Sequence, residues 1–173
     1  LPYLPVYNSD GTYYDPYTNP LWQLENWHFS ANSFRSISGL YLNYDILDNL
    51  SFRSEFGVDF MNLGEDEFRF RNIEDTGSVS SAWDRRTNVF NYTTNNYFTY
   101  HQNVGTEQEA DFTLGHSYQR SSTSGVGLNG WDFPNDNLTS PGSADPSNMS
   151  GYSYSTAFAF DSFVGFDFFA AFF

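Results

Sequence analysis

The chain has 173 residues and a formal net charge of −14 at pH 7, and 21% of its residues are aromatic, which is far more than an ordinary soluble domain carries. The acidity argues against nucleic acid as a partner, because neutralising phosphates requires a basic surface. The chain has no cysteine, which excludes disulfides and thiolate metal sites. It also has no run of about 18 apolar residues, which excludes a transmembrane helix.

The first 20 residues are rich in Pro, Tyr, Asn and Asp, with turn signals at Asp10-Gly11, Asp15-Pro16 and Asn19-Pro20. We expect an ordered loop with little regular structure there, followed by one short helical turn within residues 21–27. The chain does not begin with Met, and its first residues lack the form of a signal peptide. We therefore expect either a processed chain or an internal piece of a longer protein.

From about Ser33 the sequence alternates with a period of two residues, which predicts β-strands. A first strand extends to Ile46, and residues 47–49 form a tight turn. The next strand, residues 50–60, alternates most clearly, and its length matches the roughly 9–11 residues that a tilted strand needs to cross a bilayer. Its apolar face carries Leu50, Phe52, Phe56, Val58 and Phe60, and its polar face carries Arg53, Glu55, Gly57 and Asp59. A half-buried strand of a soluble sandwich shows the same alternation.

Two polar stretches and further strands follow. Residues 62–88 are expected to form a long loop, 89–100 a third strand, 101–105 a short turn and 106–120 a fourth strand. Residues 121–151, rich in Gly, Ser, Asn, Asp and Pro, are expected to form a second long loop. The chain then alternates again over residues 152–160 and ends in a Phe-rich segment, residues 163–173.

The two expected turns are short and alternate with two long loops. Outer-membrane barrels show this asymmetry, with short periplasmic turns and long extracellular loops. The pattern predicts an all-β fold, an antiparallel transmembrane β-barrel segment of about six strands, in which residues 1–173 are part of a single β-barrel domain. Because the smallest membrane barrels have eight strands, we expect the chain to be part of a larger barrel or to pair with other chains.

Four segments match the motifs of one family. Residues 5–14, with Asn19-Pro20-Leu21, match P-V-Y-N-x-D-G-x-Y followed by N-P, and residues 40–54 match the hairpin L-x-Y-x-I-L-x-N-L-x-F-R-S. Residues 132–138 match F-P-x-D-x-L, and residues 160–165 match S-x-x-G-R except that the Arg after Gly165 is absent. In these segments the chain resembles SusC/RagA-type TonB-dependent outer-membrane transporters.

The resemblance implies an internal piece of a plugged barrel of roughly 22 strands in the bacterial outer membrane. It implies import of a large nutrient, such as an oligosaccharide or peptide, with a SusD-like surface lipoprotein covering the extracellular side. The remaining barrel strands and outer-membrane lipid would surround the chain. TonB would supply the motive force through a plug region that residues 1–173 do not include, so no energy-coupling residue is assigned.

No catalytic arrangement is recognisable, and we expect no enzyme. The three histidines, His28, His101 and His116, are scattered, and the Gly-x-Ser-x-Gly motif of a nucleophile elbow does not occur. Oxygen ligands cluster at residues 65–67 and 132–137, but neither cluster has the spacing of an EF-hand. We therefore expect no cofactor, with calcium as a hypothesis that no motif supports.

Two short motifs are candidates for ligand or partner contact. Each places a tryptophan beside polar side chains, a combination suited to stacking on a sugar face while bonding its hydroxyls. The residues are Trp83, Asp84 and Arg85 in the first expected loop, and Trp131 and Asp132 in the second. In the alternative interpretation the tryptophans anchor the loops or belong to an aromatic girdle.

The leading hypothesis is a section of a TonB-dependent transporter, and the alternative is a secreted β-sandwich that binds carbohydrate. The direction of the apolar face separates the two hypotheses. It contacts lipid in a barrel, whereas in a sandwich it packs against a second sheet.

Overall fold

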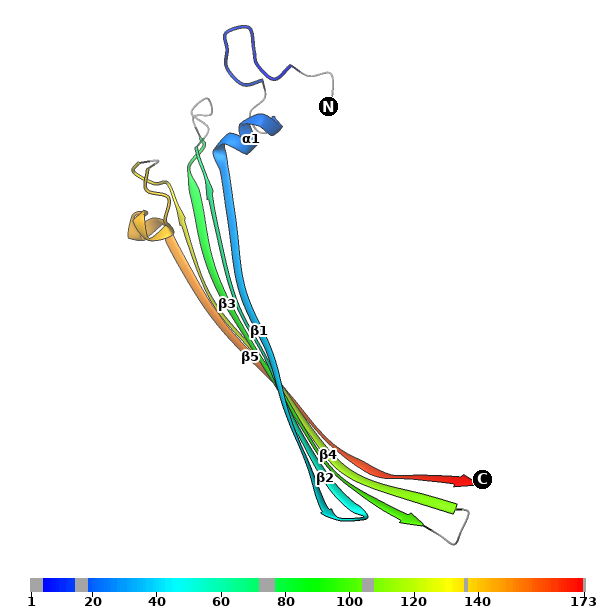
Figure 1. Ribbon diagram of the computed structural model, residues 1–173. Helices are drawn as coiled ribbons and strands as arrows, with labels where there is room; N and C mark the ends of the chain where they lie inside the picture. Colours follow the sequence, from blue (N-terminus) through cyan, green and yellow to red (C-terminus); the bar gives the residue numbers. More distant parts are fainter. Residues whose placement is uncertain (1–4, 15–18, 72–76, 104–107, 136, 173) are drawn as a thin grey trace. The chain divides into compact units, whose positions relative to one another are not determined.

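The computed structural model describes residues 5–14, 19–71, 77–103, 108–135 and 137–172. Five antiparallel strands form one sheet in the order β1-β2-β3-β4-β5, so each strand pairs with its neighbours in sequence. None of the helices in these ranges is long and apolar enough to cross a membrane. The elements in chain order are α1 (Pro20–Asn26), β1 (Trp27–Leu47), β2 (Leu50–Arg69), β3 (Ser81–Asn103), β4 (Gln108–Trp131), η1 (Pro141–Ser143), η2 (Pro146–Asn148) and β5 (Met149–Phe172) (Figure 1).

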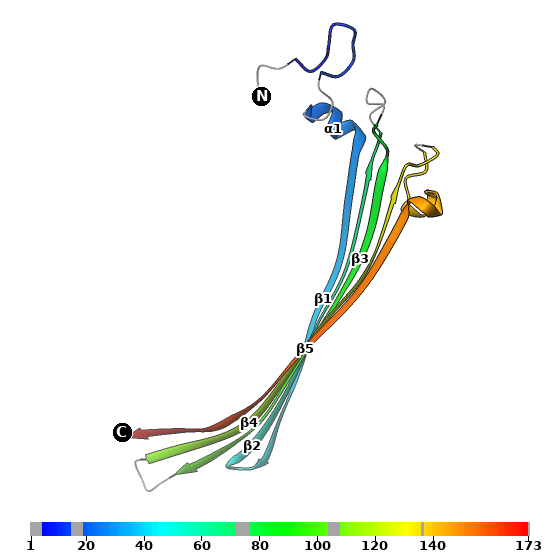
Figure 2. The ribbon, with the colours of Figure 1, turned by 180° about the vertical axis from the view of Figure 1, so that it is seen from behind.

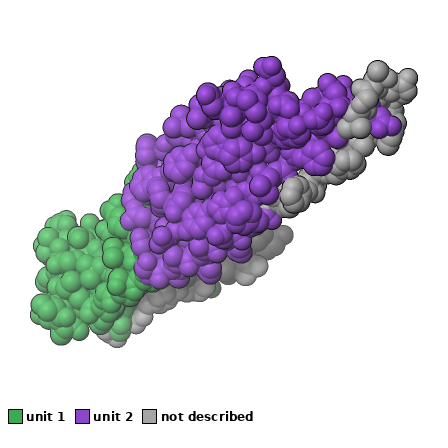
Figure 3. Space-filling model, turned by 90° about the horizontal axis from the view of Figure 1, so that it is seen from below, with its two compact units in different colours: residues 1–33, 63–87, 125–154 green, residues 34–62, 88–124, 155–173 purple. Residues whose placement is uncertain are grey.

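The chain divides into two compact units, which are described separately below (Figure 3). Unit 1 contains residues 1–33, 63–87 and 125–154, and unit 2 contains residues 34–62, 88–124 and 155–173. Unit 1 therefore holds helix α1 and the two connections that precede β3 and β5. Unit 2 holds the turn between β1 and β2.

The strands are longer than the sequence pattern predicts. β2 continues to Arg69 and β3 begins at Ser81, so the long loop predicted over residues 62–88 is wrong for most of its length. The loop predicted over residues 121–151 is likewise reduced to residues 132–148, because β4 continues to Trp131. These strand ends carry polar residues on both faces, so the hydrophobic alternation disappears while the backbone pairing continues.

The number of strands also differs from the expectation of about six. The alternating stretch at residues 152–160 and the Phe-rich end that follows it belong to one continuous strand, β5, from Met149 to Phe172, because nothing between them forces a turn. The tight turn at residues 47–49 is confirmed. β3 extends to Asn103, and the rest of the turn predicted at 101–105 lies outside the described residues.

In unit 2, the side chains of β1 to β4 separate onto two faces. Rings at even-numbered positions meet across neighbouring strands: Phe34 and Phe60 are 6.5 Å apart between ring centres, Phe52 and Phe98 4.8 Å, and Tyr100 and Phe112 6.4 Å. Polar side chains at odd-numbered positions meet on the other face, for example in the ion pair between Arg35 and Asp59. The two faces predicted for residues 50–60 are therefore confirmed.

Strand β5 reverses this relation between residue number and face. Asp161 and Phe163 both contact His116, an even-numbered residue of β4. A carboxylate oxygen of Asp161 is 2.6 Å from Nε2 of His116, and the ring of Phe163 lies 5.1 Å from the His116 ring between centres. Odd-numbered residues of β5 thus share the apolar face. Even-numbered residues of β5, including Tyr152 and Tyr154, consequently belong to the polar face.

Unit 1 contains a small core at one end of its strands. It consists of Phe68, Ala82, Phe133 and Ala144, with Phe70 and Met149 packed against it. Phe133 is 1% exposed, and its backbone N–H donates to the hydroxyl of the fully buried Ser80. This core fixes the segment 132–148, including the short turns η1 and η2 that precede β5 (Figure 2).

The segment before β1 is ordered by asparagine side chains. The side-chain oxygen of Asn19 accepts the backbone N–H groups of Leu21 and Trp22, which caps α1, and its amide donates to the carbonyls of Val6 and Tyr14. Pro20 stands at the first helical position, where its missing N–H costs nothing. The predicted turn at Asp10-Gly11 is confirmed by the positive φ of Gly11, 86°. The short predicted helical turn is the seven-residue α1.

The close approach of segment 132–148 to β4 generates a testable prediction. A Cβ at Gly130 would lie 2.7 Å from the carbonyl oxygen of Pro141, so Gly130→Ala should displace this segment at a cost of about 1–3 kcal/mol. We expect faster proteolytic cleavage within residues 132–148 of the detergent-solubilised protein. The matched control is Gly142→Ala, because a Cβ at Gly142 meets nothing within 4 Å. Equal cleavage rates for both variants and the wild type would contradict the described packing.

Candidate functional site

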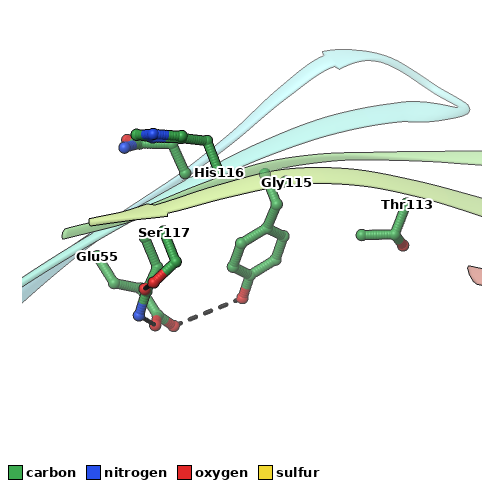
Figure 4. Close-up of a pocket in the computed structure, with 8 residues that line it drawn as sticks. Glu55, Thr113, Gly115, His116 and Ser117 are labelled. Atoms are coloured by element: carbon green, nitrogen blue, oxygen red, sulfur yellow. Dashed lines mark hydrogen bonds between the residues drawn. The ribbon is translucent and has the colours of Figure 1, made fainter. Parts of the chain in front are cut away.

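The polar face of unit 2 carries a network centred on Glu55. The amide of Asn95 donates to one carboxylate oxygen of Glu55 at 3.3 Å, and the hydroxyl of Tyr97 donates to the other at 3.5 Å. Ser117 in turn donates to the side-chain oxygen of Asn95 at 2.7 Å. Three neighbouring strands thus contribute to one polar network, which borders a depression of about 360 Å³ (Figure 4).

The charges on this face are arranged in pairs. Arg53 contacts Glu55 at 2.7 Å, and its guanidinium lies over the rings of Tyr41 and Tyr97 at 5.3 and 6.0 Å from their centres. Arg35 binds both carboxylate oxygens of Asp59, at 2.9 and 2.8 Å. This face of unit 2 therefore presents hydrogen-bonding groups together with the ion pairs Arg53–Glu55 and Arg35–Asp59.

Unit 1 contains a second depression, of about 300 Å³, which brings together two of the predicted site residues. Trp83 and Asp84, from β3, border it together with His28 of β1 and residues 66–68 of β2. Thr139, Ser140 and Pro141 complete the lining, so the segment held by the small core also shapes this site. Although acidic residues and a histidine border the site, no group of three or more His, Cys, Asp or Glu in the described ranges is placed to hold a metal ion.

Arg85 connects the predicted tryptophan site to β5. Its guanidinium lies 5.2 Å from the ring centre of Trp83, and its Nε donates to the hydroxyl of Tyr152 at 3.0 Å. Its Nη1 is 3.9 Å from a carboxylate oxygen of Glu65, on β2. On its other side Trp83 contacts the ring of Phe29, with 6.0 Å between ring centres. Trp83 and Asp84 therefore border the depression, whereas Arg85 does not border it and instead contacts Trp83, Tyr152 and Glu65.

Trp131 and Asp132 occupy a different structural position. Trp131 is the last residue of β4 and is 39% exposed. Asp132 adopts a positive φ of 54°, and its backbone N–H donates to the carbonyl of Ser80. Neither residue borders the depression that Trp83 borders. Asp132 turns the chain into the buried Phe133. Ligand or partner contact by Trp131 and Asp132 stays a prediction.

Hydrogen bonds between Asp145 and Ser147 stabilise the short turn η2, which lies outside the strands. The hydroxyl and the backbone N–H of Ser147 both donate to the carboxylate of Asp145, at 2.7 and 2.9 Å. These hydrogen bonds favour the ionised carboxylate and lower the pKa of Asp145. The charged form therefore supports η2 above the usual carboxyl pKa, and this support is lost as the pH falls through the lowered value.

The chain was compared with protein-family models, with curated sequences and with solved structures. No protein-family model matches the chain. A TonB-dependent receptor P26 from Formosa agariphila is 28% identical over 149 residues, covering 79% of this chain and 15% of the receptor. The resemblance to SusC/RagA-type TonB-dependent transporters is confirmed.

Several solved structures share the fold of the chain. The structure of the RagAB peptide transporter matches 88% of the chain with a TM-score of 0.80 and 17% identity. The open-open state of the RagAB peptide importer matches 89% with a TM-score of 0.81, and the closed-closed state matches 91% with a TM-score of 0.79. The chain spans 17–19% of these structures and 15% of the receptor, so it corresponds to a small part of each relative.

Glu55 provides a direct test of the polar network. Glu55→Gln keeps the size of the side chain but turns one acceptor into an NH₂ group that faces donors on Arg53 and Asn95 or Tyr97. We expect a lower urea midpoint for unfolding of the purified protein in detergent. Asp45→Asn, at an exposed position of β1, is the matched control and should leave the midpoint unchanged. If Glu55→Gln has the same urea midpoint as Asp45→Asn, the hydrogen bonds of Glu55 do not stabilise the fold.

Proposed function

We propose that this chain forms part of the wall of an outer-membrane TonB-dependent transporter. The observation that supports the proposal is that β1 to β4 of unit 2 carry contacting rings on one face and ion pairs on the other. This division matches the wall of a barrel whose outside contacts lipid and whose inside contacts water. The sequence similarity to a TonB-dependent receptor and the shared fold with the RagAB transporter support the same assignment.

In this proposal the aromatic face contacts outer-membrane lipid, and the remaining barrel strands pair with the outer edges of β1 and β5. β1 and β5 are the outer strands of the described sheet, so each has one edge that pairs with no strand in the described residues. An unpaired strand edge in lipid would leave backbone N–H and C=O groups without partners, so the edges require further strands. The polar network around Glu55 then borders the path of the solute.

The substrate class that we propose is a large polar nutrient, an oligosaccharide or a peptide. Relatives of the same fold are described as a peptide transporter and importer, and the polar face offers hydrogen-bonding groups to either class. A SusD-like surface lipoprotein is the proposed partner on the extracellular side, and TonB the proposed source of motive force. We propose no catalytic role and no cofactor.

The alternative, a secreted β-sandwich, requires a second sheet that packs against the apolar face. The described strands form one sheet, and the similar structures are transporters. These observations favour the barrel wall.

The proposal predicts opposite outcomes for arginine at two adjacent positions of β2. Phe56 lies on the aromatic face, 6.3 Å from Tyr92 between ring centres and 44% exposed. Phe56→Arg should block assembly in the outer membrane, because a cation facing lipid near the bilayer midplane costs about 2–4 kcal/mol. Assembly is measured by the amount of heat-modifiable protein in the outer-membrane fraction.

Gly57→Arg is the matched control for this test. Gly57 lies on the polar face, and a Cβ there meets nothing within 4 Å. An arginine at this position should be tolerated, since it extends into water. Equal assembly of the two variants, or loss of assembly for Gly57→Arg alone, would contradict the proposed orientation of the sheet.

A further inference from the structure

Two tyrosines of β5, Tyr152 and Tyr154, lie next to each other within unit 1. The rings of Tyr152 and Tyr154 are 6.5 Å apart between centres and nearly parallel, with an interplanar angle of 16°. The side chains remain 44% and 40% exposed. We call this pair the tyrosine platform.

Each ring of the tyrosine platform rests on a glycine of β4. A Cβ at Gly127 would lie 2.5 Å from the ring of Tyr152, and a Cβ at Gly125 would lie 2.6 Å from the ring of Tyr154. The rings thus occupy the space that side chains would fill, and they lie against the strand backbone. One side of each ring covers the sheet, and the other side is left open.

The hydroxyl groups of both rings are held by β3. The Nε of Arg85 donates to the hydroxyl of Tyr152 at 3.0 Å, and the hydroxyl groups of Thr87 and Tyr154 are 3.3 Å apart. Glycines below and hydrogen bonds at the edge therefore fix the rings before any ligand arrives. A preordered surface of this kind binds without the entropic cost of ordering its side chains.

Polar groups border the tyrosine platform on both sides. Arg85 also lies near the carboxylate of Glu65 and over the ring of Trp83. On the other side, the amide of Asn129 donates to the hydroxyl of Ser150 at 3.4 Å. The guanidinium of Arg85 is already shared between a carboxylate and a phenol, so no uncompensated charge is offered to a ligand.

We propose that the tyrosine platform binds the pyranose rings of a neutral oligosaccharide. The C–H face of a sugar stacks on an exposed aromatic ring, and its hydroxyls bond the polar groups at the ring edges. Two nearly parallel rings, each lying over its own glycine of β4, offer adjacent stacking positions along the strand. An extended peptide that binds by strand addition needs an unpaired sheet edge, whereas β4 is paired on both sides and, in the proposed barrel, the outer edge of β5 pairs with a further strand. The inference rests on the proposed transport function and specifies its substrate class.

The test measures binding by the full-length protein in detergent with isothermal titration calorimetry. The probes are cellohexaose, maltohexaose and an uncharged hexapeptide of alanine and serine. The Tyr152→Leu/Tyr154→Leu variant keeps an apolar cover over the glycines but removes the flat rings. We expect wild-type protein to bind at least one of the two hexasaccharides and this variant to bind it roughly tenfold more weakly.

Two further variants separate stacking from structure. Tyr152→Phe/Tyr154→Phe keeps the rings and should retain most of the affinity, which a purely hydrogen-bonding role of the hydroxyls would not allow. Tyr92→Leu/Tyr118→Leu removes a pair of rings 5.7 Å apart on the apolar face and should leave the affinity unchanged.

The inference is overturned if neither hexasaccharide binds, if only the hexapeptide binds, or if the double leucine variant on β5 binds as tightly as the wild type. Each of these results leaves the transporter proposal intact when the protein assembles in the outer membrane. Failure of the proposed function would instead appear in the arginine test on β2, which involves no ligand.

Discussion

The structure depends on keeping the two faces of the sheet separate from strand to strand. Side chains of a strand alternate between faces, so a slip of one residue in pairing would move every ring to the polar side. Contacts on both faces fix the register: Phe52 meets Phe98 on one, and Arg35 meets Asp59 on the other. Because β1 to β4 of unit 2 carry rings on one side and the ion pairs Arg35–Asp59 and Arg53–Glu55 on the other, this part of the sheet can face lipid and water at once.

Strand β5 departs from this arrangement in a way that creates a second kind of surface. Its even-numbered tyrosines share the face of the odd-numbered residues of β3 and β4, and they fit there because β4 carries glycine at residues 125 and 127. Aromatic cover of glycine is a known device for stabilising strands. Here it also places two open ring faces beside Arg85 and Thr87, so the element that completes the packing of β4 also offers a surface for stacking.

The sequence was sufficient to predict the strand type, the two faces of residues 50–60 and the turn at 47–49, because one face of each strand there is clearly apolar. It failed at the strand ends. Glu65 and Arg85 suggested loops, but both lie in strands and approach each other to 3.9 Å across the sheet. Trp83 and Asp84 were found as candidates, whereas Glu55, Asn95 and the two tyrosines of β5 were not. Their roles depend on cross-strand register, which periodicity within one strand does not contain.

Spin labels along β3 test most directly whether the even-numbered face of β1 to β4 contacts lipid and their odd-numbered face contacts water. The chain has no cysteine, so single cysteines at residues 90–99 can be labelled one at a time and examined in the outer membrane by power-saturation electron paramagnetic resonance. We expect even positions to be accessible to oxygen, which concentrates in lipid, and odd positions to be accessible to a water-soluble nickel chelate. Even positions protected from both reagents would indicate a dry core against a second sheet and would contradict the barrel wall.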